Sequence, residues 1–201
     1  MKWIIGIDEV GRGALAGPVV VAAALIPFSR ARLGGRTPGP LKDSKKLSAK
    51  SREAWVEYFK RHPDVTFALA RVYPRGIEKL NISKAANLAA LRAFIKLSKM
   101  THVPAGTPVI LDGGLFLGNG KARKPAKTMV KADETVPAVA VASIVAKVSR
   151  DRFMCRLARS YPAYGFEGHK GYGTKIHREA IQKTGPCEAH RLTFLRSHYR
   201  I

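Results

Sequence analysis

Apolar runs of strand length, rich in β-branched residues, open the chain. Residues 3–8 and 17–26 are two such runs, and the glycine-containing segment between them, residues 9–16, is typical of a tight loop. The chain therefore begins with a predicted strand, a loop and a second strand. Three further runs of this kind predict strands at residues 64–73, 108–111 and 127–131.

Apolar residues at helical spacing predict two helices in the middle of the chain. Residues 49–61 form the first, for which Ser48 is a suitable N-cap. The second begins at Asn81 or Ser83 and runs to about Met100. Its predicted apolar face consists of Leu88, Leu91, Phe94, Ile95 and Leu97.

Two more helices are predicted towards the end. Residues 136–159 form a long one whose first half is apolar enough to be buried, and a shorter helix starts at Thr174 and is terminated by Gly185 and Pro186. Strands that come first and then alternate with helices favour an α/β fold, in which helices cover a mixed sheet. We expect one domain over residues 1–201.

Charge narrows the class of partner. Lys and Arg number 36 against 14 Asp and Glu, so the formal net charge is +22, and a field of this sign and size attracts polyanions. Nucleic acid is the expected partner, although ribosomal and histone-like proteins share this composition and cut nothing. The chain also carries two predicted basic surface loops, at residues 29–40 and 115–127.

Other classes are disfavoured by what the sequence lacks. Cys155 and Cys187 form no CxxC pair and have no histidine cluster beside them, so we expect free thiols rather than a zinc site or a disulfide. The chain has neither a signal-peptide pattern nor an apolar run of 18 residues. A cytoplasmic protein without a membrane segment is predicted.

Acidic residues are scarce, and four of them stand at the ends of predicted strands. Asp8 and Glu9 end the first strand, and Asp112 and Asp133 follow two later ones. Several carboxylates buried together repel one another and lose hydration unless cations neutralise them. A single Asp at a strand end is often only a turn residue, but four acids in so basic a chain favour a metal site.

The ligand type indicates which metal. Carboxylate oxygens without His or Cys favour Mg²⁺ or Mn²⁺ over zinc. Two such ions, which in two-metal phosphodiester hydrolysis lie about 3.5–4 Å apart, would balance four carboxylates and leave room for a phosphate. The predicted chemistry is therefore metal-dependent hydrolysis of a phosphodiester.

Six motifs, spread over nearly the whole chain and in the same order, resemble those of ribonuclease HII. They are DEVGRG at residues 8–13, DSKKLS at 43–48, VILDGG at 109–114, KAD at 131–133, ASIVAKVSRDR at 142–152 and HKGYGT at 169–174. The resemblance implies a ribonuclease H-like fold with a helical C-terminal extension, about residues 161–201, that binds substrate.

The resemblance also implies the reaction. The expected activity is endonucleolytic cleavage of the RNA strand of RNA·DNA hybrids, and cleavage 5′ of single ribonucleotides in duplex DNA, leaving a 3′-hydroxyl and a 5′-phosphate. By motif, Asp8, Glu9, Asp112 and Asp133 are the metal-binding acids, and Asp8 bridges both ions. Adjacent strand residues point to opposite faces, so Asp8 and Glu9 serve one site only if the strand ends there.

Substrate contacts are carried over in the same way. Gly11, Arg12 and Gly13 are expected to read the ribose 2′-hydroxyl, with the two glycines allowing the bend after the strand. Tyr172 is expected to stack on the deoxyribose of the following nucleotide, the alternative being local packing against the C-terminal helices. Three lysines are expected to touch phosphates: Lys45, Lys46 and Lys170.

Some features leave alternatives open. Asp151 competes with Asp133 as fourth acid, but its place in a predicted helix between Arg150 and Arg152 favours an ion pair. Thr135 stands where many members of the family have Lys or Ser, and residues 34–40 lengthen the segment before DSKKLS. These departures bear on substrate preference.

Two other functions remain in competition at this stage. A noncatalytic basic nucleic-acid-binding protein would bind with strong salt dependence and cleave nothing. Another nuclease of the same fold is the second alternative: the GRG and KGYG motifs disfavour a junction resolvase, and the lack of an extra N-terminal domain disfavours ribonuclease HIII. A monomer is expected.

Overall fold

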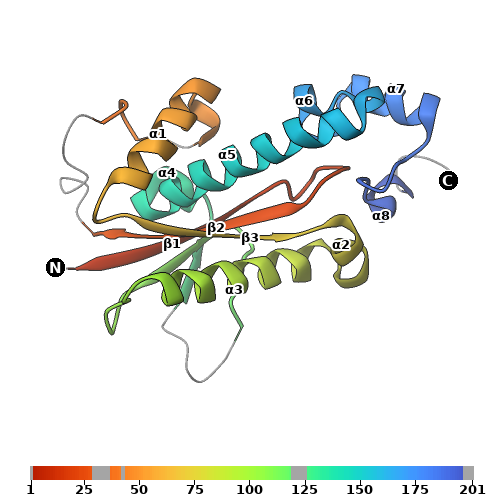
Figure 1. The fold of residues 1–201 in the computed structure, drawn as a ribbon. Helices are drawn as coiled ribbons and strands as arrows, with labels where there is room; N and C mark the ends of the chain where they lie inside the picture. Colours follow the sequence, from red (N-terminus) through yellow and green to blue (C-terminus); the bar gives the residue numbers. More distant parts are fainter. Residues whose placement is uncertain (1, 29–36, 42–43, 119–125, 197–201) are drawn as a thin grey trace.

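The computed structural model describes residues 2–28, 37–41, 44–118 and 126–196 (Figure 1). These residues form a five-stranded mixed sheet in the order β3-β2-β1-β4-β5, in which β1, β2 and β3 are antiparallel and β4 and β5 run parallel to β1. The strands are β1 (Trp3–Val10), β2 (Val19–Pro27), β3 (Thr66–Val72), β4 (Val109–Asp112) and β5 (Ala126–Met129).

Helices cover both faces of the sheet. In Figure 1, α3 lies along one face, and α5 with α1 lies along the other. The helices up to the end of the long central one are α1 (Ala49–Arg61), α2 (Pro74–Leu80), α3 (Ile82–Met100), α4 (Ala132–Thr135) and α5 (Pro137–Ser160). The predicted α/β fold with a mixed, helix-covered sheet is confirmed, and so are the N-cap of Ser48 and, of the two proposed for α3, that of Asn81.

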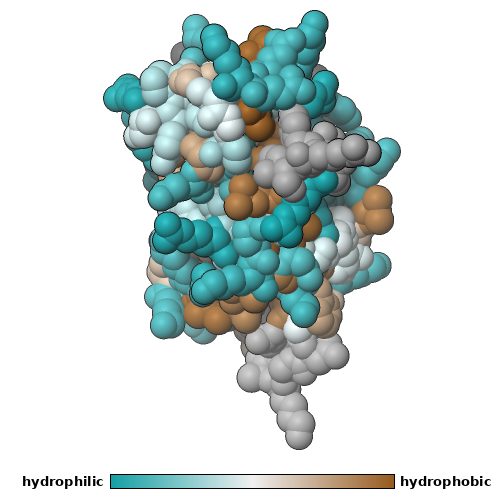
Figure 2. Space-filling model, turned by 90° about the vertical axis from the view of Figure 1, so that its right-hand side faces the viewer, coloured by the Kyte–Doolittle hydropathy of each residue, from teal (hydrophilic) through white to brown (hydrophobic). Residues whose placement is uncertain are grey.

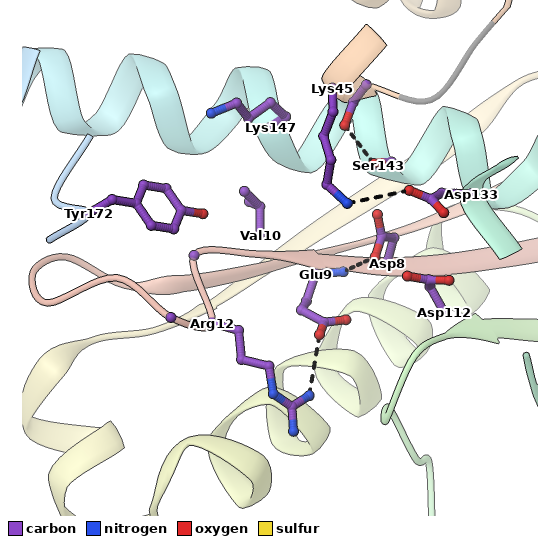
Figure 3. A pocket seen from close by; sticks show the side chains of 13 residues that line it. Asp8, Glu9, Val10, Arg12, Lys45, Asp112, Asp133, Ser143, Lys147 and Tyr172 are labelled. Atoms are coloured by element: carbon purple, nitrogen blue, oxygen red, sulfur yellow. Dashed lines mark hydrogen bonds and ion pairs between the residues drawn. The ribbon is translucent and has the colours of Figure 1, made fainter. Parts of the chain in front are cut away.

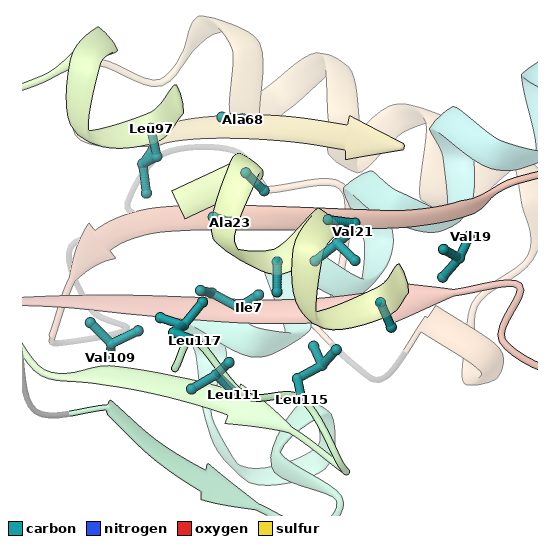
Figure 4. Close-up of a cluster of buried hydrophobic side chains, with 14 of the residues drawn as sticks. Ile7, Val19, Val21, Ala23, Ala68, Leu97, Val109, Leu111, Leu115 and Leu117 are labelled. Atoms are coloured by element: carbon teal, nitrogen blue, oxygen red, sulfur yellow. The ribbon is translucent and has the colours of Figure 1, made fainter. Parts of the chain in front are cut away.

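The sheet separates two apolar cores. Alternate residues of β1 point to opposite faces, so that Ile5 and Ile7 pack on the α3 side and Ile4 packs on the α5 side. Figure 4 shows Ile7 within the cluster on the α3 side. Gly6 lets α5 approach closely, because a Cβ at that position would lie 2.1 Å from the carbonyl carbon of Ala138. The small residues in the first half of α5 thus bury a helix tightly against the strand that carries the first acids.

The predicted apolar face of α3 is wrong in its centre. Ile95 is 45% exposed, and the fully buried face is made of alanines and Leu97. Leu88, Leu91 and Phe94 are only partly buried at its edge. Alanines occupy the buried face because a helix packed closely against a sheet has no room for long side chains there. The buried alanines are Ala85, Ala86, Ala89, Ala90 and Ala93.

The first strand also differs from the expectation. It continues through Asp8 and Glu9 to Val10, each paired with a residue of β2, instead of ending at Asp8. The reason is that β2 is long enough, and buried throughout, to pair with every residue up to Val10. Asp8 and Glu9 therefore point to opposite faces of the sheet.

The C-terminal part packs beyond the end of the sheet. It contains α6 (Phe166–His169), α7 (Lys175–Thr184) and α8 (Leu192–Arg196), and has its own cluster of buried residues together with Leu15 and Met154. Figure 2, which shows the molecule from this end, has a mainly hydrophilic face with hydrophobic residues in separate areas. Thr174 caps α7 and Gly185 ends it, as predicted.

Several sequence predictions concern segments that are only partly described. The basic loops at residues 29–40 and 115–127, and Asp43 of the DSKKLS motif, lie wholly or in part outside the described residues. No helix in the described ranges is long and apolar enough to cross a membrane. Cys155 and Cys187 form no disulfide, as expected.

Candidate active site

Three of the four predicted acids meet at one end of the sheet. Asp8, Asp112 and Asp133 each offer one carboxylate oxygen, and these atoms all lie within 4.8 Å of one another. We call these three residues the acid cluster. The register explains the first contact: β1 and β4 are parallel neighbours with Ile7 opposite Leu111, so the next residue of each strand is an aspartate.

Asp133 reaches the cluster from a different kind of element than predicted. It does not end a strand: β5 ends at Met129, and Asp133 lies in the first turn of the short helix α4. Lys131, in the left-handed conformation at φ 56°, turns the chain into that helix. The amide of Ala132 then donates a 2.6 Å hydrogen bond to Asp112 Oδ1, which fixes α4 beside β4.

The cluster is electrostatically unfavourable without a cation. Asp8 is only 5% exposed, and burial, followed by the charges of Glu9 and Asp112, raises its pKa well above the usual range. Lys45 Nζ lies 3.9 Å from Asp133 Oδ2, but that lysine side chain is 83% exposed. A divalent ion would relieve this repulsion, so hard oxygen ligands and burial both fit a metal site.

Glu9 stands beside the cluster and is not part of it. Asp8 points to the α5 face, and Glu9 points to the α3 face, where its Oε1 accepts a 3.3 Å hydrogen bond from Arg12 (Figure 3). Its Oε2 is buried and has no hydrogen-bond partner among the described residues. Burial raises the pKa of Glu9 although Arg12 opposes the shift. One carboxylate oxygen of Glu9 is thus left for a ligand.

A cavity of about 370 Å³ joins these acids to the predicted substrate residues. In Figure 3, Asp112 and Asp133 lie at one end and Tyr172 at the other. The cavity is lined by Asp8, Glu9, Val10, Gly11, Arg12, Gly13, Ser44, Lys45, Asp112, Asp133, Ser143, Lys147 and Tyr172. All four acids, the whole GRG segment, Tyr172 and one predicted lysine therefore share one cavity.

Residues 11–13, which we call the glycine turn, do not bend as predicted at both glycines. Gly11 has φ 84°, and a Cβ there would lie 2.1 Å from Arg150 Nε. Gly13 lies in the same turn, but it has no positive φ and open space around it, so the bend does not require a glycine at this position. The side chain of Arg12 is held between Glu9 and Ser83, whose Oγ accepts a 3.0 Å bond.

Tyr172 is held by the turn between α6 and α7. Its ring faces the cavity and lies 5.3 Å from the guanidinium carbon of Arg150. Its backbone oxygen accepts a 3.0 Å hydrogen bond from His177 Nδ1. A half-exposed aromatic ring, fixed through its backbone, is well placed to contact a sugar or a base.

The three predicted phosphate-binding lysines are in different places. Only Lys45 lines the cavity. Lys46 forms a 3.1 Å ion pair with Glu134, and Lys170 donates to the carbonyl of Glu167. A surface ion pair of this kind contributes about 0–1 kcal/mol, so it does not prevent contact with a phosphate.

Asp151, the competing acid, is in an ion pair as predicted. Its partners are Lys147 at 2.9 Å and Arg52 at 3.9 Å, and not the flanking arginines. The reason is helical geometry: residues four apart share a face of α5, whereas neighbours diverge. Asp151 is not part of the acid cluster.

Four cavity residues were missed by sequence reasoning: Val10 and Ser44, and on α5 Ser143 and Lys147. Ser143 supports the site, since it bonds Ser44 Oγ at 2.8 Å and hydrogen-bonds Asp8. Lys147 lines the same wall. Both lie on α5 at a spacing of four, which was visible in the sequence, but the apolar composition around them suggested only a buried helix.

Comparisons with known proteins agree with one another. The sequence model of the family described as Ribonuclease HII matches residues 5–200. A ribonuclease HII of Caldicellulosiruptor bescii is 39% identical over 196 residues, covering 98% of this chain and 88% of the relative. One of Chlorobium chlorochromatii is 43% identical over 196 residues, covering 96% and 89%.

A solved structure is similar over almost its full length. The ribonuclease HII in the PCNA:RNase HII complex of Archaeoglobus fulgidus matches with a TM-score of 0.72 and 26% identity, covering 94% of this chain and 93% of that one. The ribonuclease H-like fold expected from the motifs is therefore confirmed, with its five-stranded mixed sheet and helical C-terminal part.

Proposed function

The chain belongs to the ribonuclease HII family and is an endonuclease that acts on RNA–DNA hybrids, and from this premise we propose that the acid cluster and Glu9 hold the divalent ions with which it cuts. The observation that supports this most is the cluster itself. Three carboxylates from β1, β4 and α4 lie within 4.8 Å of one another in a chain of net charge +22. A fold gains nothing from such mutual repulsion unless a cation binds.

We assign Mg²⁺ or Mn²⁺ to the site, with two ions in the working complex. Asp8 would contact both ions, because it is the most deeply buried of the described acids and faces Asp112 and Asp133. Glu9 contributes its unpartnered Oε2 from the other side of β1. Two ions held by these four residues would supply activation of the attacking water and stabilisation of the leaving oxygen.

The protein side chains place the substrate over the cluster. Lys45 approaches the cluster from the η2 turn (Ser44–Lys46) and would contact the phosphate, and its ion pair with Asp133 would yield to it. The glycine turn reads the ribose 2′-hydroxyl through its backbone. Tyr172, at the other end of the cavity, stacks on the sugar of the next nucleotide. Lys46 and Lys170 contact more distant phosphates.

This arrangement gives a cut on the 5′ side of a ribonucleotide that leaves a 3′-hydroxyl and a 5′-phosphate. Both RNA–DNA hybrids and duplex DNA with one embedded ribonucleotide are substrates, because recognition needs only one ribose beside the acids. Residues 161–201 bind the duplex beyond the cut.

One assay tests the proposal. Matched duplexes with zero, one or several ribonucleotides are incubated with the protein and Mg²⁺, Mn²⁺ or chelator, and the cut is mapped. We expect cleavage only with ribose and a divalent ion, at the 5′ side of the ribonucleotide. Cleavage in the presence of chelator would contradict the metal site, and cleavage of the all-DNA duplex would contradict ribose recognition.

A further inference from the structure

Arg191, in the C-terminal part, reaches the glycine turn from inside the protein. Its side chain has no exposed surface, and its guanidinium donates to three backbone carbonyls: to Gly11 at 2.7 Å, to Arg12 at 2.9 Å, and to Gly17 at 2.9 and 3.0 Å. Among the described residues it forms no ion pair. A buried charge is tolerated here because each of the three guanidinium nitrogens donates to a carbonyl.

These bonds fix the direction of the amides in the turn. No peptide bond in the described ranges is cis, and in a trans peptide the C=O and the following N–H point in opposite directions. The carbonyls of Gly11 and Arg12 point at Arg191, so the amides of Arg12 and Gly13 point away from it. Within the described residues neither amide donates to another protein group, and both residues line the cavity.

The C-terminal part would remain attached to the segment after the glycine turn without the Arg191 guanidinium. Backbone bonds already join the two segments: the amide of Arg191 donates to Leu15, that of Gly17 donates to Ala189, and those of Leu15 and Ala16 donate to Gly171. All these bonds involve residues 15–17. Within the described C-terminal part, the Arg191 guanidinium is the group that bonds the carbonyls of the glycine turn itself, and the Gly11 carbonyl also accepts a 3.4 Å bond from the amide of Ala14.

We propose that Arg191 is a positioning residue for ribose recognition: by binding the carbonyls of Gly11 and Arg12 it presents the amides of Arg12 and Gly13 to the 2′-oxygen of the substrate. The inference rests on the proposed reading of ribose by the glycine turn. It makes the C-terminal part a determinant of specificity as well as of affinity.

Binding measured without cleavage tests this. In an Asp112→Asn background, affinities are measured for a duplex with one ribonucleotide and for the same duplex made entirely of DNA. We expect Arg191→Met to bring their ratio close to one by weakening only the ribonucleotide complex. Arg191→Lys keeps the charge but has no planar fork to span three carbonyls, so we expect an intermediate ratio.

A matched control separates positioning from stability. Leu195→Ala removes a fully buried side chain from α8, in the same part of the chain, without touching the turn. We expect it to lower stability and leave the affinity ratio unchanged. In amide NMR spectra, the resonances of Arg12 and Gly13 should shift in the Arg191 variants and not in Leu195→Ala.

Two failures have different meanings. If the parent protein shows no preference for the ribonucleotide duplex, the proposed reading of ribose by the glycine turn fails, and the inference fails with it. If the parent has the preference and Arg191→Lys and Arg191→Met keep it, or if Leu195→Ala loses it equally, the role of Arg191 is only structural. Should Arg191→Met not fold, Arg191→Lys decides.

Discussion

Two groups of buried charge lie on either side of the glycine turn, and the protein treats them in opposite ways. The acid cluster brings like charges together, and the ion pair that one of them forms is with Lys45, a mostly exposed lysine. Arg150 and Arg191, which we call the arginine clasp, are more deeply buried than these acids and donate to backbone carbonyls. The clasp is complete in the folded chain, whereas the acid cluster is completed only by something that binds.

The difference separates what a buried charge does for the fold from what it does for the reaction. Unpaired charge in the interior destabilises the folded state, so we expect it only where a bound ligand neutralises the charge and offsets the lost stability. Fully hydrogen-bonded charge fixes the conformation of the groups it binds. Substitutions in the acid cluster should therefore alter chemistry, and substitutions around the clasp should alter geometry and stability.

The largest effect is expected from Asp112→Asn. The variant keeps an oxygen to accept the bond from Ala132 but loses the negative charge that a cation needs. We expect cleavage of a duplex with one ribonucleotide to fall by at least about a thousandfold, with hybrid binding preserved. Single-turnover cleavage and an equilibrium binding assay measure the two quantities.

Stability provides the control for this variant. Removing one of three clustered charges lessens repulsion, so in chelator the free energy of unfolding should stay the same or rise. A variant that cleaves at the normal rate would show that the acid cluster is not the metal site. A variant that is inactive because it is unfolded would show that Asp112 belongs to the fold.

Gly11→Ala tests the clasp side of the comparison. Its Cβ would overlap the Arg150 guanidinium, and φ 84° is unfavourable for alanine. The conformation alone costs about 1–2 kcal/mol, and displacing a buried, fully bonded arginine adds about 1–3 kcal/mol. Urea unfolding should show a loss of about 2–5 kcal/mol with an accompanying loss of activity.

Gly13→Ala is the matched control for that substitution. It lies in the same turn, without a positive φ and with nothing within 4 Å of the new Cβ. Its stability should change by less than about 1 kcal/mol. Equal losses for the two glycines would mean that the turn is not held by the clasp.

The acid cluster could be predicted in part from the sequence, whereas the arginine clasp could not. Asp8 and Asp112 could be predicted, because an acid directly after an apolar strand in a basic chain is conspicuous. Arg150 and Arg191 could not, because an arginine that is satisfied by carbonyls leaves no charged partner in the sequence. Hydropathy places such a residue on the surface, whereas it is fully buried here.

The same limit applies to the fold. The five strands and the helices α1, α3, α5 and α7 followed from periodicity, whereas the short helices α2, α4, α6 and α8 did not. The apolar face of α3 was not predicted either, because large residues such as Ile95 outweigh alanines in a hydrophobic pattern. The extension of β1 to Val10 depends on pairing with β2, a contact that no local pattern contains. Sequence reasoning thus identified the chemistry, and tertiary contacts decided how its residues are oriented.

Mild acid should change the free energy of unfolding in opposite directions through two groups: the buried histidines of the C-terminal part and Asp8 of the acid cluster. Burial lowers the pKa of His177 and of His190 to about 4, below the unfolded value of about 6.5. Their stabilising contribution is therefore present above about pH 6.5 and is lost as the pH falls towards 4, up to about 3 kcal/mol for one group. The raised pKa of Asp8 has the reverse sign, so its contribution grows as the pH falls.

The pH dependence of stability, compared between the parent protein and Asp8→Asn, separates the contribution of the histidines from that of Asp8. His177 donates through Nδ1 to Tyr172, and its Nε2 contacts His190 Nε2 at 3.1 Å, so a second proton would set two N–H groups against each other. In chelator, Asp8→Asn should steepen the loss of stability on acidification between about pH 6.5 and pH 4, because the opposing group is gone. Urea midpoints against pH measure it, and an unchanged slope would assign the acid sensitivity elsewhere.

The smallest expected effect is the stabilisation of the protein by its metal. At a free concentration of Mn²⁺ or Mg²⁺ about ten times the dissociation constant, binding should raise the free energy of unfolding by about 1.4 kcal/mol. Asp133→Asn should lose this increment, since Asp133 is one of the three oxygen donors. Asp151→Asn is the matched control: its carboxylate is held by Lys147 and Arg52, so the increment should remain.

Thermal unfolding with and without ions measures the increment in both variants. An increment that survives in Asp133→Asn but not in Asp151→Asn would place the metal site on α5 instead. Because the arginine clasp needs nothing from solution, Arg191→Lys should lower the starting stability and still show the full increment.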